Sequence, residues 1–118
     1  MYEVSFYETE NGRVPVVEYM ERLTKQGKTK ELAQIMSYVS RLEKYGLAVN
    51  ITYPDTIRKL QGDVWELKPG NNRVFFFYFT GDKFILLHAY RKFKMKAPQK
   101  EIDQANKEMN DHIRRHKR

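Results

Sequence analysis

Two turn sequences inside a run of extended residues restrict the fold of this chain most strongly. Pro69-Gly70-Asn71-Asn72 and Gly81-Asp82 separate three stretches rich in β-branched and aromatic residues, at 64–68, 73–80 and 83–92. Gly, Asn and Asp favour the tight turns that join antiparallel strands. We therefore predict an antiparallel meander of three strands in the second half of the chain.

The residues before this meander predict a strand followed by a helical hairpin. Residues 2–7 have the alternation of a strand. Pro15 fits the first turn of a helix, and Thr29 is expected to cap a second helix that Gly46 ends. The segment from Leu47 to Gly62 is less regular, and we expect only a short extended piece at 57–60.

After the meander, Pro98 is expected to open a last helix, which frays over residues 114–118. The predicted fold class is therefore α+β: an antiparallel β-sheet of about four strands, with two N-terminal helices packed on it and a C-terminal helix. A length of 118 residues suits a single domain over 1–118.

The charge of the chain is concentrated near its C-terminus. Residues 91–118 hold ten Lys or Arg against four Asp or Glu, whereas residues 1–90 hold twelve against eleven. A polyanion such as RNA is the natural partner for this excess, although a solvated basic helix would have the same composition. The chain has no cysteine, which excludes disulfides and cysteine-bearing zinc sites and favours a cytoplasmic location. We find no signal peptide and no membrane-spanning run.

The two turns predict which side chains of the meander meet. A two-residue loop at 81–82 places Arg73 opposite Tyr90 and Phe75 opposite His88, and a four-residue loop at 69–72 places Glu66 opposite Phe75. One face of the sheet is then expected to carry Glu66, Lys68, Arg73, Phe75, His88, Tyr90 and Lys92. The opposite face is expected to be the core, formed by Trp65, Leu67, Val74, Phe76, Tyr78, Ile85, Leu87 and Ala89.

The polar face has the groups that cleave RNA without a metal ion. A base must deprotonate the ribose 2′-hydroxyl, cations must offset the charge on the phosphate, and an acid must protonate the leaving 5′-oxygen. Arg73 and Lys92 suit the phosphate. Glu66 or His88 is a candidate base, and Tyr90 or His88 a candidate acid. Ordinary residues on a solvent-facing sheet, with Glu66 in a weak surface ion pair, would give the same pattern.

Other chemistries find little support in the sequence. There is no Gly-rich phosphate loop and no Ser nucleophile elbow. His112 and His116 are spaced i, i+4 but lie in a basic segment without a nearby carboxylate as third ligand, so no metal site and no cofactor are expected.

Several segments together resemble the RelE/HigB toxin superfamily, in particular its phage-derived, HigB-like branch. The resemblance covers nearly the whole chain. It is carried by the runs Arg58-Lys59-Leu60-Gln61-Gly62-Asp63-Val64-Trp65-Glu66-Leu67-Lys68, Asn72-Arg73-Val74-Phe75-Phe76-Phe77, Ile85-Leu86-Leu87-His88-Ala89-Tyr90-Arg91-Lys92 and Lys96-Ala97-Pro98.

The resemblance implies the toxin of a type II toxin–antitoxin pair, a ribosome-dependent and metal-independent endoribonuclease that cuts translated mRNA. By position, Arg73 matches the arginine that these toxins place on the scissile phosphate, and Lys92 the basic residue ending the last strand. The resemblance also implies a cognate helix-turn-helix antitoxin and contact with ribosomal RNA, with DNA met only through the antitoxin complex. The expected RNA-binding residues are Lys59, Lys68, Lys94 and Lys96.

Two other functions remain open at this point. One is a gyrase-targeting toxin of the ParE type, which shares the fold but needs no such polar cluster. The other is a non-catalytic module that binds nucleic acid or an antitoxin.

Overall fold

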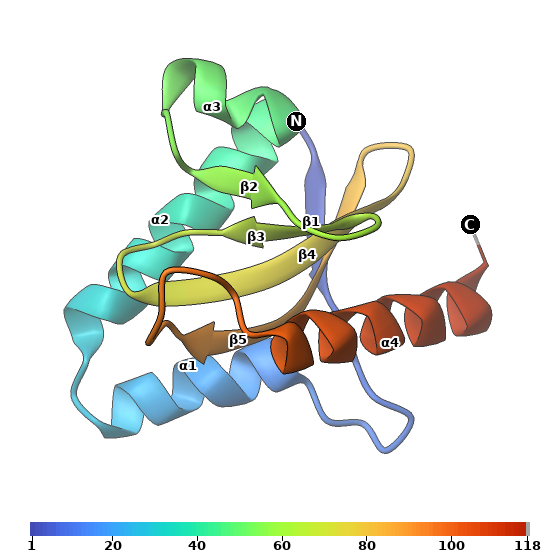
Figure 1. Ribbon diagram of the computed structural model, residues 1–118, viewed down its shortest axis with the longest axis horizontal. Coiled ribbons are helices and arrows are strands. Elements are labelled where there is room, and N and C mark those ends of the chain that lie inside the picture. Colours follow the sequence, from blue (N-terminus) through green and yellow to red (C-terminus); the bar gives the residue numbers. More distant parts are fainter. Residues whose placement is uncertain (118) are drawn as a thin grey trace.

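The central element is a sheet that helices cover on both faces. The computed structural model describes residues 1–117. In chain order the elements are β1 (Glu3–Phe6), α1 (Pro15–Lys25), α2 (Thr29–Tyr45), a 3-10 turn η1 (Gly46–Ala48), α3 (Val49–Thr52), β2 (Ile57–Lys59), β3 (Val64–Leu67), β4 (Asn72–Thr80), β5 (Lys83–Arg91) and α4 (Gln99–His116) (Figure 1).

The sheet has five strands in the order β1-β5-β4-β3-β2. The pairs β2–β3, β3–β4 and β4–β5 are antiparallel, which confirms the predicted meander, and the 57–60 piece pairs with it as β2. β1, however, lies parallel to β5, so the sheet is mixed and has one strand more than expected. Turn signals identify hairpins, but the parallel partners β1 and β5 are separated in sequence by the helices α1 to α3 and by the strands β2 to β4, so their pairing has no local signal.

The predicted register holds at the end of the meander where the candidate site lies. Arg73 pairs with Tyr90, Phe75 with His88, and Glu66 with Phe75. Beyond Phe75 the register shifts by one residue, so that Phe76 pairs with Leu86. Such a bulge reverses the expected faces of the residues beyond it.

The two faces of the sheet carry two separate cores, and this corrects the predicted faces. The core beneath α1 and α2 includes Leu67, Val74, Phe76, Phe84 and Leu86. The core beneath α4 includes Val64, Phe75, Phe77, Ile85, Leu87, Tyr90, Ile102, Ala105 and Met109. The placement of Ile85 and Leu87 with Phe76 was therefore wrong, because the β5 bulge turns them to the α4 side.

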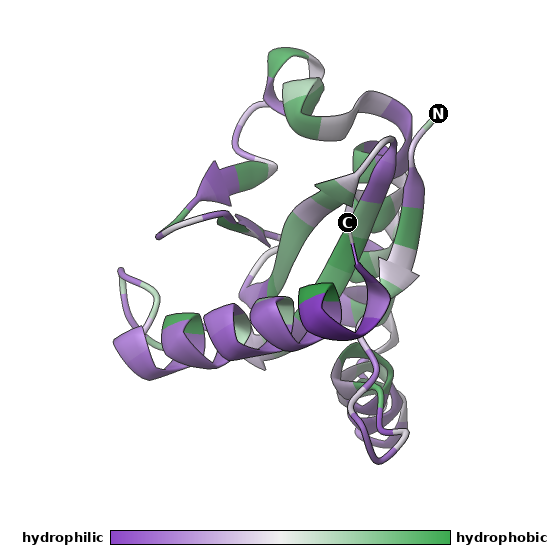
Figure 2. Cartoon of the chain, turned by 90° about the vertical axis from the view of Figure 1, so that its right-hand side faces the viewer, coloured by the Kyte–Doolittle hydropathy of each residue, from purple (hydrophilic) through white to green (hydrophobic). Residues whose placement is uncertain are grey.

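The expectation that the polar face stays open to solvent was also wrong. The helix α4 is amphipathic and lies across that face, while its outer surface is hydrophilic (Figure 2). Phe75 and Glu66 beneath it are completely buried. A period-two strand pattern shows which residues share a face but not whether a later helix covers that face.

The helix limits follow the sequence closely. α1 begins at Pro15, and α2 ends at Tyr45, directly before Gly46, whose φ of 61° favours glycine. A Cβ there would lie 2.5 Å from the ring of Tyr2. Thr29 is the first residue of α2 rather than its cap and makes no capping hydrogen bond.

The last helix differs from its prediction at the C-terminal end. α4 continues to His116 instead of fraying from Arg114, and Arg118 lies outside the described residues. Within residues 1–117, no helix combines the length and the apolar character needed to cross a bilayer.

Candidate functional site

Glu66 on β3 anchors two arginines and has no exposed surface of its own. Arg58 on β2, directly opposite Glu66, contacts its Oε2 through Nε at 2.8 Å and Nη2 at 2.6 Å. Arg73 Nε on β4 lies 3.8 Å from Oε1, which has no hydrogen-bond partner in the described part of the chain. We call Arg58, Glu66 and Arg73 the Glu66 cluster. Buried charges need such compensation, so Glu66 fixes the positions of both guanidinium groups.

The backbone of the β3–β4 turn holds Arg73 from the other side. Its Nη1 donates to the carbonyl oxygens of Gly70 at 2.7 Å and of Asn72 at 2.9 Å. Gly70 has a φ of 62°, and a Cβ at this position would lie 2.6 Å from the Gln34 amide oxygen. The turn therefore requires glycine in order to present its carbonyl to Arg73. With only 6% exposure, the Arg73 side chain is held in a single direction.

The two arginines line a cavity of about 480 Å³ together with two lysines. We call this the cationic pocket, defined by Arg58, Lys68, Arg73 and Lys92. One carboxylate, that of Asp55, also lines it and lies 2.7 Å from Lys68 Nζ. This contact with Lys68 lowers the pKa of Asp55. Four cations against one anion in a small concave space make a site for a phosphate group.

Lys92 reaches this pocket because β5 ends beside the β3–β4 turn. Its backbone N–H donates to the carbonyl of Asn71 at 2.8 Å. The structure thus brings together three of the residues expected at the site: Arg73, Lys92 and Lys68. Glu66 stands behind them, as an anchor for the arginines rather than as a wall of the pocket.

His88 lies apart, between two carboxylates of α4. Its Nδ1 is 2.6 Å from Glu108 Oε1, and its Nε2 is 3.1 Å from Glu101 Oε1. Burial opposes the charged imidazolium, but the hydrogen bonds and charges of Glu108 and Glu101 outweigh it and raise the pKa of His88. We call His88, Glu101 and Glu108 the His88 cluster. Both ring nitrogens are engaged, so the cluster ties α4 to β5.

Tyr90 is also enclosed. Its ring packs edge-on against Phe75 with 5.4 Å between centroids, and 8% of the residue is exposed. Burial, followed by the nearby charge of Glu66, raises its pKa to about 12. The phenol therefore keeps its proton at neutral pH. It is not among the residues that line the cationic pocket.

The remaining predicted RNA-binding lysines surround the site. Lys59 and Lys96 line a second cavity beside the cationic pocket, which we call the glutamine pocket after Gln61 and Gln99 in its wall. Lys94 is exposed in the loop between β5 and α4. Sequence reasoning did not assign a role to Arg58, although it lines both cavities. The register of β2 against β3 would have identified it, because that register places Arg58 opposite Glu66.

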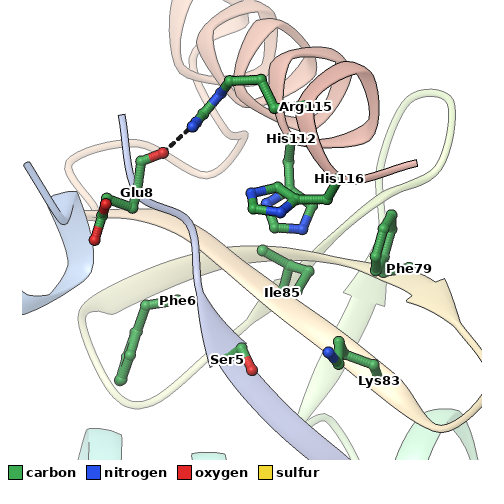
Figure 3. A pocket seen from close by; sticks show the side chains of 9 residues that line it. All are labelled: Ser5, Phe6, Glu8, Phe79, Lys83, Ile85, His112, Arg115 and His116. Atoms are coloured by element: carbon green, nitrogen blue, oxygen red, sulfur yellow. Dashed lines mark hydrogen bonds between the residues drawn. The ribbon is translucent and has the colours of Figure 1, made fainter. Parts of the chain in front are cut away.

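A third cavity lies at the far end of the sheet, between β1, β5 and the end of α4 (Figure 3). The rings of His112 and His116 stack there, 4.2 Å apart, and point from the helix toward the strands. Burial, followed by the positive charges of His116, Arg115 and Lys83, lowers the pKa of His112 to about 4. Within residues 1–117, no cluster of three or more His, Cys, Asp or Glu side chains could hold a metal ion.

A comparison with protein families found a match. The family described as phage derived protein Gp49-like (DUF891) matches residues 18–110, which run from α1 into α4 and include both arginines of the cationic pocket. A comparison with curated proteins found no match.

Proposed function

Because the chain belongs to the Gp49-like family, whose members are among the RelE/HigB-like toxins, we propose that it is a type II toxin that cleaves mRNA on the ribosome. The observation that carries the proposal is the cationic pocket, in which two arginines fixed by one buried carboxylate face the same cavity. Fixed donors aimed at a phosphate are what a phosphoryl-transfer site without a metal ion requires.

The reaction proposed is transesterification by the ribose 2′-hydroxyl. The 2′-oxygen forms a bond to phosphorus, and the bond from phosphorus to the 5′-oxygen breaks, leaving a 2′,3′-cyclic phosphate and a 5′-hydroxyl. Arg58 and Arg73 offset the charge that builds on the phosphate oxygens. Lys92, which has no carboxylate partner among the described residues, is placed to donate the proton to the 5′-oxygen.

The proton of the 2′-hydroxyl needs an acceptor in the same cavity. Asp55 is the carboxylate among the residues that line it. Glu66 is completely buried, and His88 has both nitrogens engaged, so neither reaches the pocket in this conformation. We assign the acceptor role to Asp55, and the Glu66 carboxylate positions the arginines.

The outer surface of α4 supports a role in docking. Lys100, Lys107 and Arg114 are exposed and spaced seven residues apart, so they lie along one stripe of the helix. We propose that this stripe contacts ribosomal RNA through its phosphates in the cytoplasm. A helix-turn-helix antitoxin that covers the cationic pocket is the proposed neutralising partner.

Induced expression tests the proposal. We expect growth arrest and mRNA cut within codons, mapped by primer extension, with both effects lost in R73A. Double-strand DNA breaks without RNA cuts would indicate a gyrase-targeting toxin instead. Absence of growth arrest by the folded wild-type chain would indicate a non-catalytic module.

A further inference from the structure

The glutamine pocket adjoins the cationic pocket and has a different lining. It has a volume of about 430 Å³ and lies between β2, the β2–β3 turn and the start of α4. Arg58 lines both cavities, and the consecutive residues Met95 and Lys96 line one each. An RNA strand with one phosphate bound in the cationic pocket therefore has the glutamine pocket directly beside that phosphate.

The lining combines three features of a nucleobase site. The first is an apolar surface, formed by Leu60, Ala97 and Ile102, against which a planar ring can pack. The second is a pair of amides, from Gln61 and Gln99. The third is a group of cations, Arg58, Lys59 and Lys96, which suits the phosphates on either side of a nucleoside.

The two amides hydrogen-bond to each other and keep free hydrogen-bonding capacity. Gln61 Nε2 donates to Gln99 Oε1 at 3.1 Å, and Gln99 Nε2 donates back to Gln61 Oε1 at 2.9 Å. Gln99 Nε2 also donates to Asp103 Oδ1 at 2.9 Å. Gln99 has therefore used both amide hydrogens, whereas Gln61 keeps one, and each carbonyl oxygen keeps a lone pair. Amide groups with a free donor and free acceptors can distinguish the edges of the bases.

We propose that the glutamine pocket binds the base of a nucleotide flanking the scissile phosphate and sets the base preference of the RNA substrate. This inference rests on the proposed endoribonuclease function, because that function places the phosphate in the neighbouring pocket. The apolar surface accepts the ring, and the Gln61 N–H and the two carbonyl oxygens select its edge.

The test uses four 2′-O-methyl tetranucleotides, each of a single base type, which cannot be cleaved because the attacking hydroxyl is blocked. Binding to the purified chain is measured by calorimetry, and the methyl signals of Ala97 and Ile102 are followed by NMR. We expect the wild type to prefer one base and these signals to shift most with that probe.

Two kinds of variant separate the ring surface from the amides. A97F fills the cavity and is expected to weaken binding of the preferred probe about tenfold, while the matched control A33F, on the exposed side of α2, leaves it unchanged. Q61A and Q99A are expected to reduce the ratio between the best and worst probes about fivefold. Q26A, an exposed glutamine after α1, is their control.

The outcomes distinguish this inference from the function on which it rests. If A97F and the glutamine variants bind all four probes as the wild type does, the pocket is not a base site, whether or not the chain cleaves RNA. If inorganic phosphate alone shifts the Ala97 and Ile102 signals and the probes add nothing, the inference is equally overturned. If the probes bind with base preference but the chain cuts no mRNA, the pocket is a base-binding site and the endoribonuclease proposal fails.

Discussion

The Glu66 cluster and the His88 cluster both bury charged side chains on the sheet face that α4 covers, but they differ in what their polar atoms contact. In the Glu66 cluster the carboxylate is enclosed and the cations around it face a cavity. In the His88 cluster the imidazole is enclosed and both of its nitrogens are paired with carboxylates. A buried polar residue therefore indicates a site only where part of its hydrogen-bonding capacity is directed toward a ligand.

The largest effect on the rate of mRNA cleavage is expected from R73A, in the Glu66 cluster. Loss of a fixed cation at the phosphate should lower the rate of mRNA cleavage by about 10²–10³-fold, the usual effect of removing one transition-state donor. Cleavage is followed by primer extension, and the fold by circular dichroism. R13A removes an exposed arginine that does not line the pocket and should leave the rate unchanged. An R73A protein that is folded and cuts at the wild-type rate would contradict the assignment.

E66Q is expected to lower both stability and rate, because it keeps the shape of the side chain but removes the charge between two arginines. Breaking a buried ion pair on one side costs about 3–5 kcal/mol in general, and the partial exposure of Arg58 should reduce this to about 2–3 kcal/mol. Urea unfolding measures the loss. We also expect kcat to fall more than tenfold, because Arg58 and Arg73 lose their common anchor. A stable E66Q protein with unchanged kcat would show that the carboxylate does not position them.

Asp55, which lines the cationic pocket, is expected to act on the rate of cleavage. D55N keeps the size of the side chain and removes the proposed proton acceptor, so cleavage should slow by about 10²-fold. The acidic limb of the pH–rate profile, which reflects the lowered pKa of Asp55, should also disappear. A D55N enzyme with the wild-type profile would assign the base to another group.

The smallest effects are those of pH on stability. They should have opposite signs for His88 on β5 and His112 on α4. The pKa of His88 is raised, so its contribution to stability is complete below pH 6.5 and is lost as pH rises through the raised value. The pKa of His112 is lowered to about 4, so stability falls as pH drops from 6.5 toward 4.

Unfolding free energies from pH 4 to 9 for the wild type, H88Q and H112F would separate the contributions of the two histidines. H88Q should remove the loss of stability at high pH, and H112F should remove the loss of stability at low pH. If H88Q and H112F both unfold with the pH dependence of the wild type, the two histidines do not contribute to stability as described.

The parts of the fold that sequence predicted well are those with local signals. The turns at 69–72 and 81–82 placed Arg73 opposite Tyr90 and Glu66 opposite Phe75, as observed. The β5 bulge could not be predicted in this way, because one extra residue has no distinctive composition. The parallel pairing of β1 also depends on contacts far apart in sequence.

The candidate site was likewise predicted only where local sequence signals determine it. Arg73, Lys68 and Lys92 meet in one cavity because the register places them at one end of the sheet. Arg58 was missed because its partnership with Glu66 depends on the short strand β2. The engagement of His88 was not foreseen either, because Glu101 and Glu108 belong to a helix whose docking on the sheet no strand pattern encodes.

The central claim is that the chemistry belongs to the open cationic pocket and that the His88 cluster is structural. The most direct test compares the mRNA cleavage rates of K92A and H88Q, at one pH where both proteins are shown to be folded. We expect the cleavage rate of K92A to fall at least 10²-fold, whereas that of H88Q stays within about threefold of the wild type, because His88 touches no reacting atom. A folded H88Q protein that no longer cuts RNA, beside a K92A protein that still does, would contradict this claim.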